Sequence, residues 1–241
     1  MNKVTIIKKV KANLIRLKVH KVLGWAADLL IYTGYMIKLS KWVESNKDKL
    51  QFDDFFNSNV IHRDREKLYA QVNEHLNLQN EPINYLEFGV AGGDSLRWWS
   101  SNNKNIETKL WGYDTYEGLP ENYGTMKKGT FDQKGNFPNI SDVRINFIKG
   151  LFQDTLLKSM NDIDFSKRLI IHVDGDLYSS AMFCLNTLYP SLKKGDLIIF
   201  DEFGVPSHEF KAYLDLVSTY YLKLKPIGAI NNYLQVVFEV E

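Results

Sequence analysis

The sequence lacks several features that mark particular classes of protein. Its 241 residues contain one cysteine, Cys184, so an internal disulfide and a cysteine-cluster metal site are both excluded. No apolar run reaches the ~20 residues that a membrane-spanning helix needs, and no small-residue cleavage site follows the first apolar segment. With 44% hydrophobic and 13% aromatic residues, the chain can bury a full core. We therefore expect a globular protein of the reducing cytoplasm, built from one domain and an appendage.

The chain also has almost no net charge, with 30 Lys and Arg residues against 29 Asp and Glu. This balance conceals an asymmetry, because residues 1–21 hold 7 basic residues and no acidic one. The rest of the chain has 23 basic residues against 29 acidic ones. An acidic body without a basic stripe predicts that nucleic acid is not a partner, because phosphate binding needs clustered Lys and Arg.

The basic arm continues into an apolar segment, Val22–Tyr32, that is too short to cross a bilayer. A basic amphipathic helix can lie on an anionic membrane, which would make the protein membrane-peripheral. The alternative is that the arm packs on a core or joins a homo-oligomer. We expect residues 1–60 to form a helical extension and residues 61–241 to form the main domain.

Apolar runs alternate with polar or helical segments from residue 83 onward, which is typical of parallel strands joined by crossovers. These runs are Ile83–Phe88, Leu110–Tyr113, Ile145–Ile148, Leu169–Val173 and Leu197–Phe200. Two closing strands, Leu222–Pro226 and Tyr233–Val240, flank a turn at 228–232, and at least one of them is expected to be antiparallel. The pattern predicts an α/β, Rossmann-like fold with a doubly wound, mostly parallel seven-stranded sheet and helices on both faces. Helices are expected at Asp64–Leu78 and Ser179–Leu192, and a long loop at Glu121–Asp142.

The segment Tyr85–Ser95 is the most informative part of the chain. Its sequence, Tyr-Leu-Glu-Phe-Gly-Val-Ala-Gly-Gly-Asp-Ser, ends an apolar strand in Glu87 and a glycine-rich turn that leads into a helix. Such a turn lets a ligand approach the backbone closely and offers the unpaired N–H groups of the next helix. By itself the pattern also suits a plain strand-to-helix turn.

Asp114 follows the second apolar run, 27 residues beyond Glu87. A nucleotide-binding fold places there the carboxylate that accepts hydrogen bonds from ribose hydroxyls. The alternative is that Asp114 caps a helix, since aspartate is favoured at that position.

Four carboxylates follow two neighbouring predicted strands, which would bring them toward one spot with few basic residues nearby to neutralise them. They are Asp174, Asp176, Asp201 and Glu202. Their mutual repulsion predicts a cation, and oxygen ligands suit Mg²⁺ or another oxygen-seeking divalent ion. The alternative is that Asp176 and Glu202 cap helices while only one acid does chemistry. His172 lies within an apolar run and is expected to be core.

These motifs together resemble the class I S-adenosylmethionine-dependent methyltransferases, and within them the macrocin, mycinamicin and novobiocin sugar O-methyltransferases. The resemblance covers residues 83–204. The matching pieces are Tyr85–Ser95, Gly112–Glu121, Phe147–Leu156, His172–Ser180, Leu188–Leu192 and Asp201–Phe203.

The resemblance implies a Mg²⁺-dependent O-methyltransferase acting on a sugar or glycoconjugate hydroxyl. It assigns the metal to Asp174, Asp201 and Glu202, where the family more often has an aspartate at the third position. It assigns S-adenosylmethionine to Glu87, Gly89, Ala91, Gly93, Ser95, Asp114, Phe152 and Asp174. Asp174 is the candidate general base, with His208 and Glu209 as alternatives.

Other functions fit parts of the pattern. Methylation of a catechol would use the same metal residues. A glycosyltransferase could use Asp174-Gly-Asp176 to hold a metal and a nucleotide sugar, but it would not need the turn after Glu87. A nicotinamide dehydrogenase is disfavoured because Gly89–Gly93 departs from Gly-x-Gly-x-x-Gly. A non-catalytic protein would not need intact carboxylates at the metal position.

Overall fold

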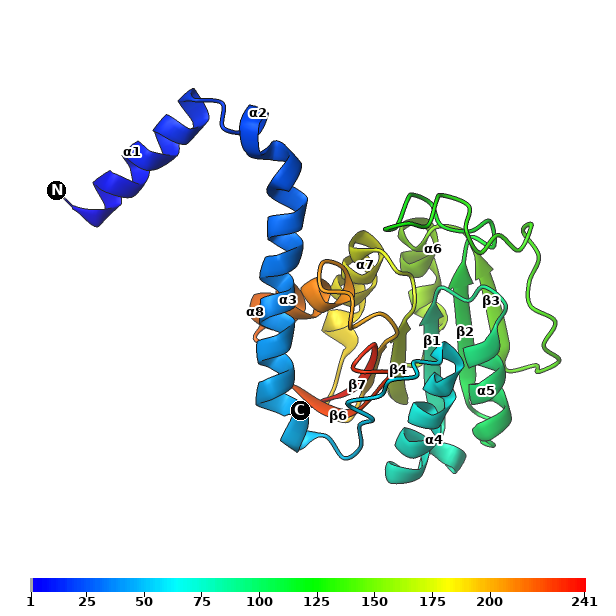
Figure 1. Cartoon of the computed structure of the whole chain (residues 1–241). Coiled ribbons are helices and arrows are strands. Elements are labelled where there is room, and N and C mark those ends of the chain that lie inside the picture. The colour runs from blue at the N-terminus through cyan, green and yellow to red at the C-terminus, as the bar shows by residue number, and fades with distance from the viewer. Residues whose placement is uncertain (1) are drawn as a thin grey trace.

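The computed structural model describes residues 2–241 and places one mixed sheet at the centre of the molecule (Figure 1). The strand order is β3-β2-β1-β4-β5-β7-β6. The strands are β1 (Ile83–Phe88), β2 (Lys109–Asp114), β3 (Ile145–Lys149), β4 (Arg168–Val173), β5 (Leu197–Phe200), β6 (Leu224–Ile230) and β7 (Gln235–Val240). The first five pair in parallel, and β7 is antiparallel to both β5 and β6. The predicted doubly wound, mostly parallel seven-stranded sheet is confirmed.

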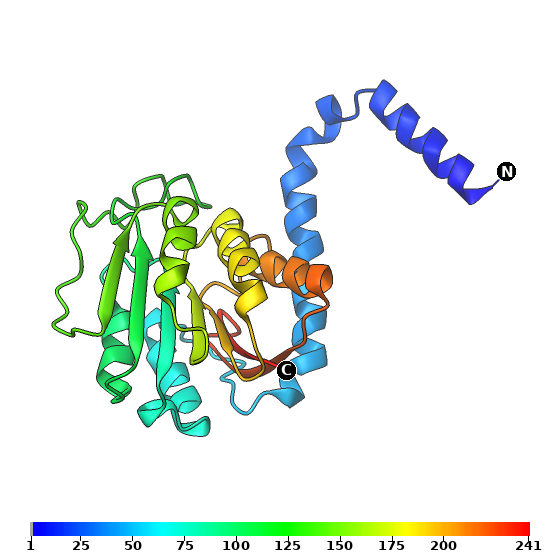
Figure 2. The ribbon, with the colours of Figure 1, turned by 180° about the vertical axis from the view of Figure 1, so that it is seen from behind.

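Helices cover both faces of this sheet (Figures 1 and 2). The helices among the described residues are α1 (Lys3–Arg16), α2 (His20–Leu23), α3 (Ala27–Asn46), α4 (Arg65–His75), α5 (Asp94–Asn102), α6 (Phe152–Ser159), α7 (Tyr178–Leu188) and α8 (Glu209–Tyr220). Short 3-10 turns are η1 (Gly24–Ala26), η2 (Lys47–Lys49), η3 (His62–Asp64), η4 (Leu78–Asn80), η5 (Met160–Asp162) and η6 (Tyr189–Ser191).

Each face of the sheet has its own apolar core. On one face, α4 and α5 bury Tyr69 and Trp99 against the strands. On the other, α6, α7 and α8 pack with the far half of α3 in a layer that includes Phe210. Cys184 is fully buried in this second layer, as expected. Because both faces are covered, the open end of the sheet at the strand carboxyl ends is the place left for a ligand.

The N-terminal helices are only partly joined to this body. Trp42 of α3 packs edge-on against Phe203 and Tyr213, and its Nε1–H donates a hydrogen bond to the Tyr213 hydroxyl at 3.0 Å. By contrast, α1 and α2 extend away from the domain (Figure 1). No helix among the described residues is both long and apolar enough to cross a membrane.

Two predicted boundaries are wrong. The extension is helical only through Lys49, after which residues 50–61 are non-helical and Phe52 forms a parallel bridge with Gly228. The closing turn lies at 231–234 rather than 228–232. Gly228 belongs to β6, where it pairs with Val237, and the ring of Phe52 occupies the space where a Cβ at this position would stand.

Candidate active site

The turn between β1 and α5 depends on glycine for contact with the next strand. Gly89 has φ +98°, and a Cβ placed there would lie 1.9 Å from the backbone oxygen of Asp174. Gly93, with φ +77°, immediately precedes α5 and packs on Pro138. Any side chain at Gly89 would therefore separate the ends of β1 and β4.

Asp114 is held against this same turn. Its Oδ2 accepts hydrogen bonds from the N–H groups of Val90 and Ala91 at 2.7 and 2.8 Å. Its Oδ1 accepts from the Tyr116 N–H at 2.7 Å. The helix-cap alternative is wrong, because the next helix begins at Phe152. The carboxylate instead fixes the glycine turn at the rim of β2.

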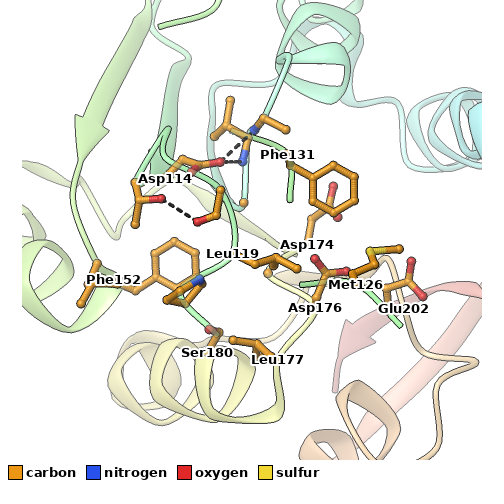
Figure 3. Close-up of a pocket in the computed structure, with 18 of the residues that line it drawn as sticks. Asp114, Leu119, Met126, Phe131, Phe152, Asp174, Asp176, Leu177, Ser180 and Glu202 are labelled. Atoms are coloured by element: carbon orange, nitrogen blue, oxygen red, sulfur yellow. Dashed lines mark hydrogen bonds between the residues drawn. The ribbon is translucent and has the colours of Figure 1, made fainter. Parts of the chain in front are cut away.

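A cavity of about 550 Å³ opens at the carboxyl ends of the strands (Figure 3). Seven of the predicted site residues line it: Gly89, Ala91, Gly93, Asp114, Phe152, Asp174 and Glu202. The long loop after β2 contributes Leu119, Met126 and Phe131. The cavity thus has a polar floor from the strand ends and a partly apolar cover.

Four predicted residues do not line the cavity. Glu87 and Ser95 are buried beneath the glycine turn, and the Ser95 hydroxyl lies 3.2 Å from that of Tyr69. Asp201 is fully buried behind Arg65. His208 stands at the start of α8, where its Nδ1 accepts the Tyr178 N–H at 3.2 Å.

Glu87 is kept from ionising by its surroundings. Burial raises its pKa to about 8, although a hydrogen bond donated by the Tyr85 hydroxyl at 2.9 Å opposes that rise. The same hydroxyl lies 2.7 Å from His172 Nδ1. His172 is fully buried, and burial lowers its pKa, so the prediction that it is core is confirmed.

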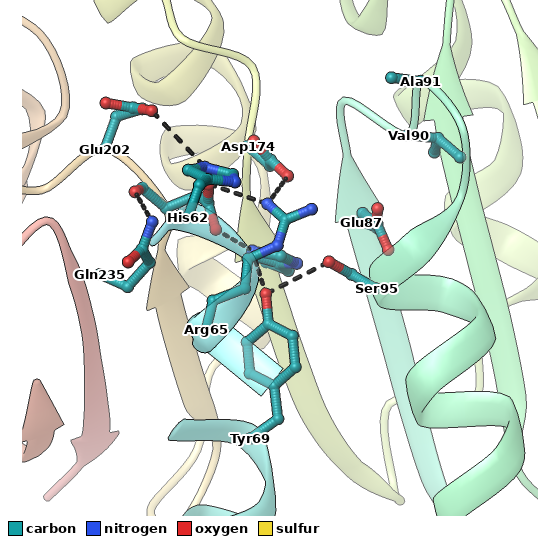
Figure 4. A network of polar contacts seen from close by, with 12 residues as sticks. His62, Arg65, Tyr69, Glu87, Val90, Ala91, Ser95, Asp174, Glu202 and Gln235 are labelled. Atoms are coloured by element: carbon teal, nitrogen blue, oxygen red, sulfur yellow. Dashed lines mark hydrogen bonds and ion pairs between the residues drawn. The ribbon is translucent and has the colours of Figure 1, made fainter. Parts of the chain in front are cut away.

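A cation from outside the sheet joins the two central acids (Figure 4). Arg65, at the start of α4, donates from one Nη1 to Asp174 Oδ2 at 3.0 Å and to Asp201 Oδ2 at 2.9 Å. His62 Nε2 lies 2.9 Å from the same Asp201 oxygen. The premise that little basic charge lies near these acids is therefore wrong.

The acids titrate unequally because their neighbours differ. Burial raises the pKa of Asp174, of Asp176 to about 6 and of Glu202 to about 7. Burial would also raise the pKa of Asp201, but its contacts with His172, His62 and Arg65 hold it well below the usual range. Asp201 is therefore the fixed negative charge that anchors Arg65.

The carboxylate oxygens fit a divalent cation, but in this structure Arg65 occupies the space between them. Asp201 and Glu202 group with His62, with all ligand atoms within 4.8 Å, whereas Asp174 groups with Glu87 and His172. Asp201 Oδ1 is buried and makes no hydrogen bond among residues 2–241, although His172 Nε2 lies 3.5 Å from it. A set of carboxylate oxygens suits a hard cation, but such a cation would have to displace the Arg65 guanidinium.

Arg65 and His62 were missed at the sequence level. Both lie before the first strand, so no strand-end pattern points to them, and only the excess of acids signalled that some cation was needed. The cavity cover formed by Leu119, Met126 and Phe131 was foreseen only as a loop over the strand ends.

Comparisons with known proteins show the family of this chain. A sequence model of the macrocin O-methyltransferase (TylF) family matches residues 46–227. The mycinamicin III 3''-O-methyltransferase of Micromonospora griseorubida is 28% identical over 112 residues, which are 44% of this chain and 41% of that protein. The demethyldecarbamoylnovobiocin O-methyltransferase of Streptomyces niveus is 27% identical over 145 residues, 52% of this chain and 54% of that protein. The chain spans about half the length of these curated relatives.

Solved structures support the fold. The calicheamicin methyltransferase CalS11 has a TM-score of 0.57 at 17% identity, covering 86% of this chain and 91% of that one. The O-methyltransferase NovP has a TM-score of 0.53 at 19% identity, covering 74% and 79%. With the family match extending over well more than half of its length, this chain belongs to the macrocin O-methyltransferase family.

Proposed function

We propose that this protein transfers a methyl group from S-adenosylmethionine to a hydroxyl of a sugar or glycoconjugate. The observation that carries the proposal is that one cavity gathers the glycine turn, Asp114 and Asp174 at the carboxyl ends of adjacent strands. This is where an open α/β sheet binds a nucleotide-like ligand. Family membership supports methyl transfer as the chemistry.

The cofactor-binding residues differ in what they offer. The turn Gly89–Gly93 offers close backbone approach for the amino-acid end of the cofactor, and Asp114 offers carboxylate oxygens for its ribose. Phe152, whose ring packs edge-on against Phe88, offers an apolar wall for the adenine. Glu87 and Ser95 are buried beneath the glycine turn and support it. S-adenosylmethionine supplies an electrophilic methyl group on a positively charged sulfur.

A divalent cation, Mg²⁺ for preference, would be held by Asp174, Asp201 and Glu202 once Arg65 has moved. Such a cation lowers the pKa of a bound hydroxyl and fixes its oxygen. The carboxylate arrangement, in which Asp201 Oδ1 makes no hydrogen bond, supports this assignment.

Asp174 is the proposed general base. It lines the cavity, and burial raises its pKa toward the range in which a carboxylate accepts a proton effectively. The alternatives are less well placed, since neither lines the cavity. The imidazole of His208 accepts a backbone hydrogen bond, and Glu209 is fully buried with its Oε2 accepting the Glu202 N–H.

The acceptor class rests on what related proteins are named for. A relative from Streptomyces olivaceus is named as a 4'-O-methyltransferase of a rhamnosyl tetracenomycin, and a CalS11 structure is titled a TDP-rhamnose 3'-O-methyltransferase. The test is transfer of labelled methyl from S-adenosylmethionine to TDP-rhamnose, rhamnosides, other nucleotide sugars and a catechol. Transfer to a sugar supports the proposal, whereas transfer to the catechol alone overturns the acceptor class.

The variant Asp174→Ala separates chemistry from cofactor binding. We expect turnover with the active acceptor to fall below detection while affinity for S-adenosylmethionine changes less than threefold. Loss of both together would show that Asp174 belongs to the cofactor site and not to the reaction centre.

A further inference from the structure

Residues 3–37, here called the N-terminal arm, form a surface that the methyltransferase body does not cover. The arm comprises α1, α2, η1 and the first half of α3. Within it, as the structure describes it, no residue is buried, and the first buried side chain along the chain is Leu39. A surface this apolar needs a partner, because isolated soluble proteins rarely expose so large a contiguous patch.

One side of α1 is apolar and exposed. Its members recur at helical spacing, with exposures of 42–72%: Ile6, Ile7, Val10, Leu14 and Leu17. The spacing puts them on one stripe, and the remaining faces carry Lys8, Lys9, Lys11 and Arg16 together with exposed Val4 and Ile15. Asn2 caps the helix by accepting the Val4 N–H, so this amphipathic helix has its own start signal.

The next part of the arm is rich in exposed apolar side chains and carries one charge, Asp28. Trp25 is 81% exposed, and Leu29, Leu30 and Ile37 are 62–67% exposed. No charged residue lies between Leu29 and Ile37. An amphipathic basic helix followed by an exposed tryptophan and a short uncharged segment suits shallow insertion at a lipid interface.

The charge of the N-terminal arm indicates which kind of partner covers it. The 7 basic residues and no acid of residues 1–21 would repel the same residues of a second copy, whereas anionic headgroups would neutralise them. The rest of the chain outside the arm, with 23 basic against 28 acidic residues, would itself be repelled by such a surface. We propose that the N-terminal arm binds the surface of an anionic lipid bilayer without crossing it.

The placement of the arm suits the enzyme. The arm and the carboxyl ends of the parallel strands lie toward the same end of the molecule, at the top of Figures 1 and 2. Docking through the arm would therefore present the cavity mouth toward the bilayer side. This inference goes beyond the proposed methyl transfer and does not depend on it.

The test is co-sedimentation of the full chain with vesicles of phosphatidylcholine alone or with about a third phosphatidylglycerol. We expect binding to the anionic vesicles at least tenfold tighter than to the neutral ones, and weaker binding as salt rises. The double variant Ile7→Glu/Leu14→Glu is expected to lose at least tenfold in binding. Its matched control is Ile106→Glu/Val143→Glu, which changes two residues of 85% and 99% exposure on the body and is expected to bind as wild type does.

Three results would overturn the proposal. The first is that the protein does not bind anionic vesicles. The second is that the arm variant and the control variant lose the same amount of vesicle binding. The third is that wild type does not bind vesicles but forms a dimer without lipid, and that Ile7→Glu/Leu14→Glu dissociates this dimer. The last result would reassign the arm to self-association. Thermal unfolding of both variants checks that the body is intact, so a negative result reports on the arm alone.

Discussion

At the scale of single residues, the site depends on backbone that passes too close for a side chain. Gly89 stands against the backbone of Asp174, whereas Gly92, three residues later in the same turn, has open space around its Cβ position. Gly89 is therefore required for steric reasons, whereas Gly92 is not.

Gly89→Ala is expected to weaken binding of S-adenosylhomocysteine, the demethylated cofactor, by at least tenfold. The added Cβ must push the turn away from β4, and a positive φ strains any residue other than glycine. Titration calorimetry measures the affinity. Gly34→Ala on α3 is the control, because that position is open and lies outside the cavity, and equal losses in both variants would contradict the steric explanation.

Glu87→Gln is expected to change how stability depends on pH. The folded-state pKa of Glu87 is raised from 4.5 to about 8, so its contribution is fully present below pH 4.5 and is lost as pH rises through 8. Each pKa unit corresponds to about 1.4 kcal/mol, which makes the loss several kcal/mol. Urea unfolding at pH 5 and pH 9 measures the free energy of unfolding of both proteins. We expect the stability of the variant relative to wild type to be higher at pH 9 than at pH 5, and an equal difference at both pH values would contradict this prediction.

Arg65→Met is expected to make stability depend on a divalent cation. Removing the guanidinium leaves Asp174 without its cation and Asp201 with only the contacts of His62 and His172, and an unpaired buried charge costs about 3–5 kcal/mol. Mn²⁺ or Mg²⁺ should restore most of that loss, as thermal unfolding with and without metal would show.

The control for Arg65 lies on the same helix. Lys67→Met removes a 66% exposed lysine paired with Asp64, and exposed pairs of this kind contribute less than about 1 kcal/mol. If Arg65→Met is as destabilised with metal as without it, the three-carboxylate metal assignment is wrong.

At the scale of elements, one side chain fastens α3 to the body. Trp42→Ala is expected to lower the free energy of unfolding by about 2–4 kcal/mol, since it removes aromatic contacts and a buried hydrogen bond. Trypsin should then cut sooner at Lys38 and Lys41. Trp25→Ala is the control, and its 81% exposed ring predicts no change in stability. Equal effects of the two substitutions would contradict the anchoring role.

The same scale shows what the sequence can predict. The five parallel strands were recognisable because each is an apolar run ended by a polar residue, and the glycine turn with Asp114 followed from their order. The bounds of the last hairpin could not be recognised from the sequence. Gly228 is typical of a turn, and only the structure shows that the ring of Phe52 covers it. Arg65 was hidden for a similar reason: only the packing of α4 beside the sheet brings it to the acids.

At the scale of the whole molecule, the chain combines an acidic catalytic body with a basic, apolar arm. The family match fixes the class of the body, and the arm lies outside the matched residues 46–227. Cofactor binding and lipid binding are therefore expected to be separable by substitution, with Gly89→Ala affecting only the first and Ile7→Glu/Leu14→Glu only the second.

The most direct test of the central claim is calorimetric titration of S-adenosylhomocysteine into the full chain, with Mg²⁺ and then with the metal chelated. Micromolar binding to wild type, weakened at least tenfold by Asp114→Asn, is the predicted result. Absence of binding in both conditions would contradict the assignment of the cavity to S-adenosylmethionine.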